Sequence, residues 1–103
     1  MKPEMKEPTP QIGTADVLCF TPIDERHRFT AACTQIVNGR VASPVQNLAI
    51  AQYAGDKGYY LFGCDTDWRC ITDTYHDSID EAKRQAEFEY AGTMATWLEL
   101  KSK

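Results

Sequence analysis

The sequence predicts an α+β fold: an antiparallel β-meander of four to five strands, followed by one C-terminal helix (about residues 78–91) packed on one face and a short terminal helical segment. The apolar runs before residue 78 are short, rich in β-branched and aromatic residues, and separated by turn signals. From residue 78 onward, apolar residues recur at helical spacing. The length of 103 residues and the 43% hydrophobic share are those of one globular domain.

Residues 1–13 are expected to form a flexible N-terminal tail, which leaves residues 14–103 as the single domain. Three of the five prolines lie in this segment among charged residues, so it buries too little apolar surface to offset its loss of conformational entropy. It also has no apolar stretch of the kind found in secretory signal peptides. We interpret the four cysteines as reduced thiols, because a chain of this length forms a core without disulfides. Together these features predict a cytoplasmic protein.

Four apolar runs predict the strands of the meander. They cover residues 16–20, 48–53, 59–64 and 68–75. Pro22 ends the first run, because proline has no N–H for the hydrogen-bond ladder. Asn38-Gly39 predicts a type I′ hairpin between residues 29–37 and 40–42, since both central positions of that turn require a positive φ.

Two further turns join the last three predicted strands. Residues 55–58 read Gly-Asp-Lys-Gly and predict a hairpin with Gly58 in the left-handed conformation. Asp65-Thr66-Asp67 predicts the next turn, because aspartate side chains accept hydrogen bonds from the backbone two residues on. Consecutive hairpin signals of this kind favour an antiparallel meander.

The helix is predicted from a capping box and an apolar stripe. In Ser78-Ile79-Asp80-Glu81 the serine hydroxyl accepts from the Glu81 N–H, and the Glu81 carboxylate reaches back. The stripe consists of Ile79, Ala82, Ala86 and Tyr90. Gly92 suits the position after the helix. Met94, Trp97 and Leu98 have the spacing of the short terminal helical segment.

Both faces of the predicted sheet carry large apolar residues. The residues expected in the core are Ile50, Leu61, Phe62, Ile71, Ile79, Ala82 and Ala86. Tyr59 and Leu61 point to one face of their strand, whereas Tyr60 and Phe62 point to the other. One helix covers only one face, so the second face must be covered by the N-terminal segment, a second protomer or a partner.

No catalytic, cofactor or metal motif is present, so we expect a protein that is not an enzyme and that uses no cofactor. Cys64 and Cys70 are separated by five residues, whereas structural zinc sites use pairs separated by two to four. Cys70, Asp73 and His76 do not form a nucleophilic set, because Cys70 and Asp73 point to opposite faces of one strand. No P-loop, nucleophile elbow or dinucleotide fingerprint occurs.

Nucleic-acid and membrane partners are also not expected. The pI is near 5.0, whereas nucleic-acid binders usually carry a basic patch. The strands contain several aromatic residues but few bases, so we assign the aromatic residues to core and interface packing rather than to a base-stacking platform. No apolar run approaches the roughly 18 residues that a membrane span requires.

Charge is unevenly distributed along the chain. Residues 64–90 contain eight acidic and three basic residues, a net charge of −5, although the whole chain carries −4. The helix dipole accounts for the acids at the helix N-terminus, residues 77, 80 and 81. Phe88 lies on the face of the helix opposite Ile79. We therefore predict a partner-binding surface made of Asp65, Asp67, Trp68, Glu87, Phe88 and Glu89.

About half of the chain, residues 47–97, resembles a group of small bacterial proteins. The resemblance is carried by residues 48–53, 59–65, 72–78 and 81–90. Proteins of this group combine a β-meander with a C-terminal helix, and some are encoded near toxin systems as immunity-like proteins. The resemblance implies a bacterial cytoplasmic protein that acts by binding.

Two functional hypotheses follow. The first is a non-enzymatic binding protein, an immunity-type inhibitor that binds a basic protein through its acidic hairpin–helix surface. The second is a small homodimeric structural or regulatory domain of unknown ligand, in which the second face of the sheet is buried against another copy.

Overall fold

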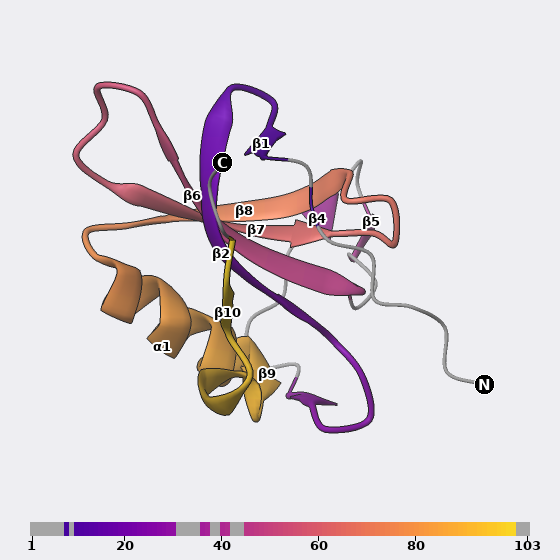
Figure 1. The fold of residues 1–103 in the computed structure, drawn as a ribbon. Helices are drawn as coiled ribbons and strands as arrows, with labels where there is room; N and C mark the ends of the chain where they lie inside the picture. Colours follow the sequence, from indigo (N-terminus) through magenta and orange to yellow (C-terminus); the bar gives the residue numbers. More distant parts are fainter. Residues whose placement is uncertain (1–7, 9, 31–35, 38–39, 42–44, 101–103) are drawn as a thin grey trace.

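The main sheet of the protein is curled, and its strands run in the order β1-β2-β6-β7-β8 with antiparallel neighbours (Figure 1). The computed structural model describes residue 8 and residues 10–30, 36–37, 40–41 and 45–100. The main strands are β1 (Gln11–Ile12), β2 (Ala15–Pro22), β6 (Asn47–Tyr53), β7 (Tyr59–Cys64) and β8 (Cys70–His76). A further strand, β10 (Leu98–Glu99), pairs with β2. With one helix beside this sheet, the α+β class predicted from the sequence is confirmed.

The meander is confirmed for β6, β7 and β8, which are joined by short turns. β2 pairs with β6 although the chain between them is long. The turn after β6 differs from the prediction, because Gly55 has the positive φ of 81° and Gly58 does not. Gly58 lies against the Tyr75 side chain instead. A Cβ at Gly58 would meet the Tyr75 ring, which would have to move.

The N-terminal end of the sheet begins earlier than the sequence suggests. Gln11 and Ile12 form β1, which turns back through Gly13 (φ 62°) onto β2. The Val17 N–H donates to the Pro10 carbonyl over 2.9 Å, and Ile12 is buried. Residues 11 and 12, which the sequence analysis assigned to the tail, are therefore paired strand residues.

Three short strands lie in the connection between β2 and β6. β3 (Arg28–Phe29) pairs with β9 (Tyr90–Ala91), and β4 (Ile36–Val37) pairs with β5 (Arg40–Val41). The second pair belongs to the predicted hairpin, and its described residues are separate from the main sheet. Its Asn38-Gly39 turn lies outside the described residues.

Helix α1 (Ile79–Glu89) begins as the sequence predicts. The Ser78 hydroxyl accepts from the Glu81 N–H over 3.1 Å, and the Glu81 carboxylate accepts from the Asp77 N–H over 3.2 Å. The helix ends two residues before the predicted limit, because Tyr90 and Ala91 are extended and pair with β3.

The segment after α1 differs from the prediction. Gly92, with a φ of 103°, precedes a single 3-10 turn, η1 (Thr93–Ala95), rather than terminating α1. The chain then becomes β10. The expected terminal helical segment is thus one turn long, because Leu98 and Glu99 hydrogen-bond to β2 instead of continuing a helix.

Buried residues form two clusters. One joins Ala82 and Ala86 of α1 to sheet residues that include Leu48, Ile50 and Leu61. The other contains Phe62 and Trp68. Its remaining buried members are Ile12, Ala15, Val17, Phe20, Ala49, Ala51 and Cys64.

Of the seven residues expected in the core, five are buried, and Ile71 and Ile79 are half-buried at the edge of the first cluster. The second face of the sheet is covered in part by the chain itself, because Ile12 of β1 and Trp68 of the β7–β8 turn belong to its cluster. None of the helices in the described part of the chain has the length and apolar character needed to cross a membrane.

Candidate protein-binding surfaces

Asp65 and Asp67, two predicted partner-binding residues, lie in the turn between β7 and β8. Asp65 organises this turn: its Oδ1 accepts from the backbone N–H of Asp67 over 2.8 Å and of Arg69 over 2.9 Å. The Trp68 N–H donates to the Asp65 carbonyl over 3.0 Å. Asp67 is exposed and Asp65 half-buried. Asp65 is thus a turn-forming residue, whereas Asp67 is an exposed residue of the same turn.

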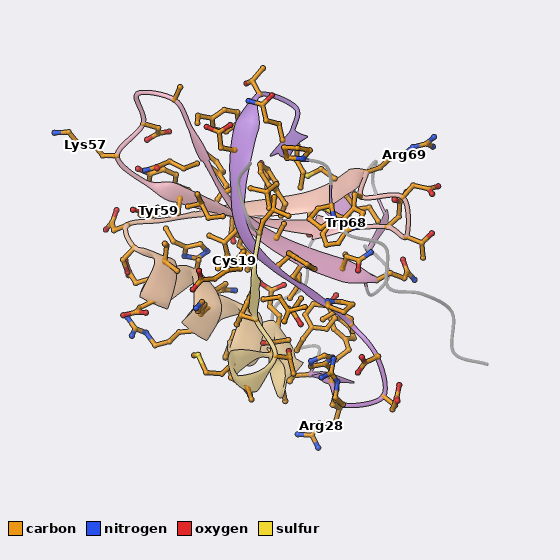
Figure 2. The ribbon with its side chains drawn as sticks, in the orientation of Figure 1. Cys19, Arg28, Lys57, Tyr59, Trp68 and Arg69 are labelled. Atoms are coloured by element: carbon orange, nitrogen blue, oxygen red, sulfur yellow. The ribbon has the colours of Figure 1, made fainter. Side chains whose placement is uncertain are left out.

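Trp68, the third predicted residue, is a core residue. Its side chain is 5% exposed and its ring meets Phe20 of β2 edge-on at 5.8 Å. The backbone at Trp68 has a φ of 64°, in the left-handed region that side chains other than glycine rarely adopt. This conformation directs the indole inward from the turn, while Arg69 points outward (Figure 2). Trp68 therefore does not offer an exposed apolar anchor.

Glu87 and Glu89 are engaged within the protein at the end of α1. The two Glu87 carboxylate oxygens accept from the backbone N–H groups of Gly92 and Met94 over 2.9 and 3.0 Å. These two hydrogen bonds lower the pKa of Glu87 from its ordinary value. Glu89 is 8% exposed and accepts from the Gln85 side-chain amide over 2.7 Å. Glu87 holds the last turn of the helix to the chain that follows it, whereas Glu89 is bonded within the helix.

Replacing Glu87 by glutamine is expected to destabilise the protein at neutral pH and to have a smaller effect in acid. The folded pKa lies below the ordinary 4.5, so the ionised carboxylate contributes stability above that pH, and this contribution is lost as the pH falls through the folded pKa. The measurement is the free energy of unfolding of both proteins between neutral pH and about pH 2.5. A difference between them that stays constant with pH would contradict the prediction.

Phe88 is the most exposed large hydrophobic residue of the described chain, with 55% of its surface accessible. Phe29 (40%) and Met94 (47%) are also exposed, and both belong to segments that are bonded to the last turn of α1. Phe29 pairs with Tyr90, and its ring lies 5.2 Å from that of Tyr90. The Thr30 hydroxyl donates to the Phe88 carbonyl over 2.6 Å. We call Phe29, Phe88 and Met94 the helix-end surface.

The six predicted residues therefore do not form one surface. Asp65, Asp67 and Trp68 lie in the β7–β8 turn, on the right of Figure 1, whereas Glu87, Phe88 and Glu89 belong to α1, at the lower left. Of the six, Asp67 and Phe88 are exposed. The continuous acidic surface expected from the sequence is divided, because the turn and the helix lie at different ends of the sheet.

A second, partly exposed group contains tyrosines that the sequence predicts to pack in the core or in an interface. Tyr60 of β7 contacts Tyr53 of β6 and Tyr75 of β8 edge-on, at ring distances of 5.2 and 5.1 Å. Tyr75 is 50% exposed, and its pKa is raised by desolvation and by the negative charge of the Asp56 carboxylate. We call Tyr53, Asp56, Tyr60 and Tyr75 the tyrosine surface. The sequence signal that places Tyr75 on an outward-facing side is its two-residue spacing from the charged Asp73 on β8.

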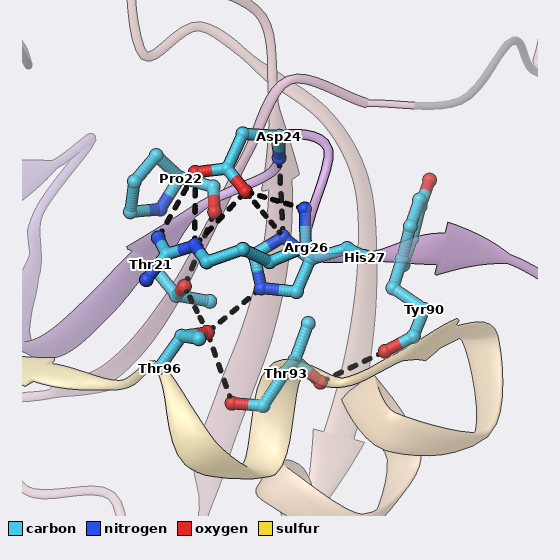
Figure 3. A network of polar contacts seen from close by, with 8 residues as sticks. All are labelled: Thr21, Pro22, Asp24, Arg26, His27, Tyr90, Thr93 and Thr96. Atoms are coloured by element: carbon cyan, nitrogen blue, oxygen red, sulfur yellow. Dashed lines mark hydrogen bonds and ion pairs between the residues drawn. The ribbon is translucent and has the colours of Figure 1, made fainter.

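The principal polar network lies around His27, in the connection after β2 (Figure 3). The imidazole is fully buried, and its Nδ1 accepts from the Asp24 backbone N–H over 3.1 Å. Its Nε2 lies 2.8 Å from the Thr96 hydroxyl, which in turn lies 2.7 Å from the Thr21 hydroxyl and donates to the Thr93 carbonyl over 3.2 Å. The network joins the connection after β2 to η1.

This arrangement resembles a hydroxyl–imidazole–carboxylate triad in its order but not in its proton positions. Because Nδ1 of His27 accepts a backbone N–H, the proton of the neutral ring lies on Nε2, which donates to Thr96. A general base requires the reverse direction, from the hydroxyl to the imidazole. The Asp24 carboxylate is bound by the Arg26 guanidinium, which lowers the pKa of Asp24 to about 2. The network is therefore suited to fixing two segments, not to nucleophilic catalysis.

The described cysteines are free thiols. Cys64 and Cys70 are direct partners in the β7–β8 ladder, yet they are not bonded to each other. Burial raises the pKa of Cys19 to about 11 and that of Cys64 to about 12, so these two thiols are poor nucleophiles. Among the described residues no group of histidine, cysteine or acidic side chains could hold a metal ion.

Thiol titration is expected to count four free groups in the denatured, non-reduced protein. In the native protein Cys70 should react before Cys19 and Cys64, because it is exposed whereas the other two are buried. The measurement is the reaction with a chromogenic disulfide, compared between the parent and single Cys→Ser variants. A count of two in the denatured protein would show that a disulfide has formed.

No protein-family model, curated protein or solved structure matches this chain. Function therefore has to be inferred from the side chains and their arrangement.

Proposed function

We propose that the chain is a non-enzymatic binding protein, an immunity-type inhibitor, that binds a basic protein partner. The observation that carries the proposal is the helix-end surface, where Phe29, Phe88 and Met94 are exposed on segments bonded to one turn of α1. Exposed aromatic and methionine side chains are enriched at the centres of protein interfaces. The resemblance of residues 47–97 to immunity-like proteins points to the same class.

The charge of α1 indicates the kind of partner. The helix carries Asp80, Glu81, Glu87 and Glu89 against two bases, Lys83 and Arg84. Asp80 and Glu81 are exposed and belong to the first turn, whereas Phe88 belongs to the last. Acidic charge on the helix that carries Phe88 favours a positively charged partner and increases its association rate.

The six residues predicted from the sequence have different roles in this proposal. Phe88 makes the apolar contact, and Asp67 contributes long-range attraction from the β7–β8 turn. Glu87 and Glu89 hold the helix end in the shape that presents Phe88, because their carboxylates bind Gly92, Met94 and Gln85.

The test combines capture from a lysate of the source cell with binding kinetics at low and high salt. Phe88→Ala should speed dissociation of the captured partner, and Asp80→Lys should slow association and weaken its salt dependence. Leu98→Ala is the matched control, because Leu98 is also exposed (41%) but belongs to β10. A partner that is indifferent to Phe88→Ala and Asp80→Lys would overturn the proposal.

A measurement of molar mass in solution distinguishes the proposed inhibitor from the alternative, a homodimeric structural or regulatory domain. A binding protein for another chain should remain at 11.6 kDa across the concentrations used. A mass twice as large that persists on dilution would favour the homodimeric domain instead.

A further inference from the structure

The tyrosine surface is a fixed arrangement, not a collection of mobile side chains. Tyr60 is held between Tyr53 and Tyr75 by edge-on contacts and is stacked on Phe62, with the two rings 12° from parallel and 5.9 Å apart. Tyr60 and Tyr75 are direct partners in the β7–β8 ladder. The Tyr75 ring lies over Gly58, where the absence of a Cβ makes room for it.

The carboxylate beside these rings is also fixed. Asp56 Oδ1 accepts from the Gly58 N–H over 3.1 Å, while the Asp56 N–H donates to the Tyr53 carbonyl over 3.0 Å. Asp73 lies two residues before Tyr75 on β8, is exposed and points to the same side of the strand. Lys57, the nearest base along the chain, points away from the sheet at the tip of the hairpin (Figure 2).

We infer that the tyrosine surface binds an arginine side chain of a basic protein partner, through the exposed ring of Tyr75 and the carboxylates of Asp56 and Asp73. The assumption that the partner is basic rests on the proposed function. The tyrosine surface itself is a different site from the helix-end surface. A guanidinium stacks on an aromatic ring and donates to carboxylates at the same time.

The chemistry of the surface distinguishes this occupant from others. Two acidic side chains beside the rings repel the phosphates of a nucleic acid. A lysine ammonium fits less well, because it does not stack on a ring with a planar face as a guanidinium does. The ring of Tyr75 is half exposed, so a partner side chain reaches it without rearrangement of the sheet.

The test is an NMR titration of the intact protein with a blocked tri-arginine peptide, with tri-lysine as the comparison. The largest shifts of amide signals are expected at Gly58, Tyr60 and Tyr75, and tri-arginine should bind more tightly than tri-lysine. Tyr75→Leu should weaken tri-arginine binding by about three- to thirtyfold, the range for a cation–π contact. Tyr75→Phe keeps the ring and should retain most of the affinity.

The contribution of the Asp56 charge to tri-arginine binding is tested with a matched pair of variants. Asp56→Asn keeps the oxygen that accepts from Gly58 and removes the charge, and it should weaken binding. Glu25→Gln makes the same change in net charge at an exposed site in another loop and should leave the affinity near that of the parent. Equal effects of the two variants, or no effect of Tyr75→Leu, would overturn the inference.

Two outcomes separate this inference from the proposed function. If tri-arginine shifts the amide signal of Tyr75 but the lysate yields no basic partner, the inference of an arginine-binding surface is supported and the proposed function fails. If a partner depends on Phe88 while Tyr75→Leu changes nothing, the proposed function stands and this inference fails. Shifts at Tyr75 that grow with protein concentration in the absence of peptide would mean that a second copy occupies the surface, and would overturn the inference.

Discussion

Phe62→Ala is expected to lower the free energy of unfolding by about 3–5 kcal/mol, which threatens the folding of a domain of this size. Phe62 lies in the middle of the sheet, between Ala49 of β6 and Asp73 of β8, and is 3% exposed. Its ring stacks on Tyr60. Its partner on β6 is the small side chain of Ala49, which cannot fill the cavity that the substitution leaves.

The effect is measured by urea unfolding followed by circular dichroism. Phe88→Ala is the matched control, because it makes the same exchange on an exposed side chain and should change stability by less than about 0.5 kcal/mol. A Phe62→Ala protein as stable as the Phe88→Ala protein would show that the second cluster is not packed as described.

Trp68→Ala is expected to have a comparable effect, about 3–5 kcal/mol. The indole closes the second cluster by meeting Phe20 of β2 at 5.8 Å, so its loss opens the curled sheet at the β7–β8 turn. Trp68→Gly removes the same contacts but tolerates the positive φ of 64°. The glycine variant should therefore be more stable than the alanine variant by about 1 kcal/mol.

Urea unfolding of the three proteins measures both differences. An alanine variant that is as stable as the parent would mean that Trp68 is not a core residue. A glycine variant less stable than the alanine variant would mean that the backbone at position 68 is not left-handed.

The elements that could be predicted from the sequence are those defined by nearby residues. The meander of β6, β7 and β8 follows from short apolar runs separated by turn residues, and the start of α1 follows from a capping box within four residues. The Asn-Gly hairpin was predicted for the same reason. Each of these signals acts over a few positions of the chain.

The features that could not be predicted depend on residues distant in the sequence. Pairing with β3 ends α1 before Tyr90, and no residue close to Tyr90 in the sequence predicts this end of the helix. Trp68 is buried because the curl of the sheet brings Phe20 to the β7–β8 turn. Glu87 is occupied because Gly92 and Met94 fold back onto it. Charge counted along the chain could not separate such internally bound carboxylates from exposed ones.

The pairing of β10 with β2 sets the order in which the protein acquires its structure. Leu98 and Glu99 pair with Phe20 and Cys19, so the two partners are separated by most of the chain. During synthesis, which proceeds from the N-terminus, β2 is made long before β10 exists. In the meantime β1 pairs with Ala15 and Asp16, but the outer edge at Cys19 and Phe20 stays unpaired. An unpaired strand edge is prone to pair with other chains. Emergence of β10 from the ribosome is therefore the step that closes this edge, and contacts between such distant positions make that closure slow.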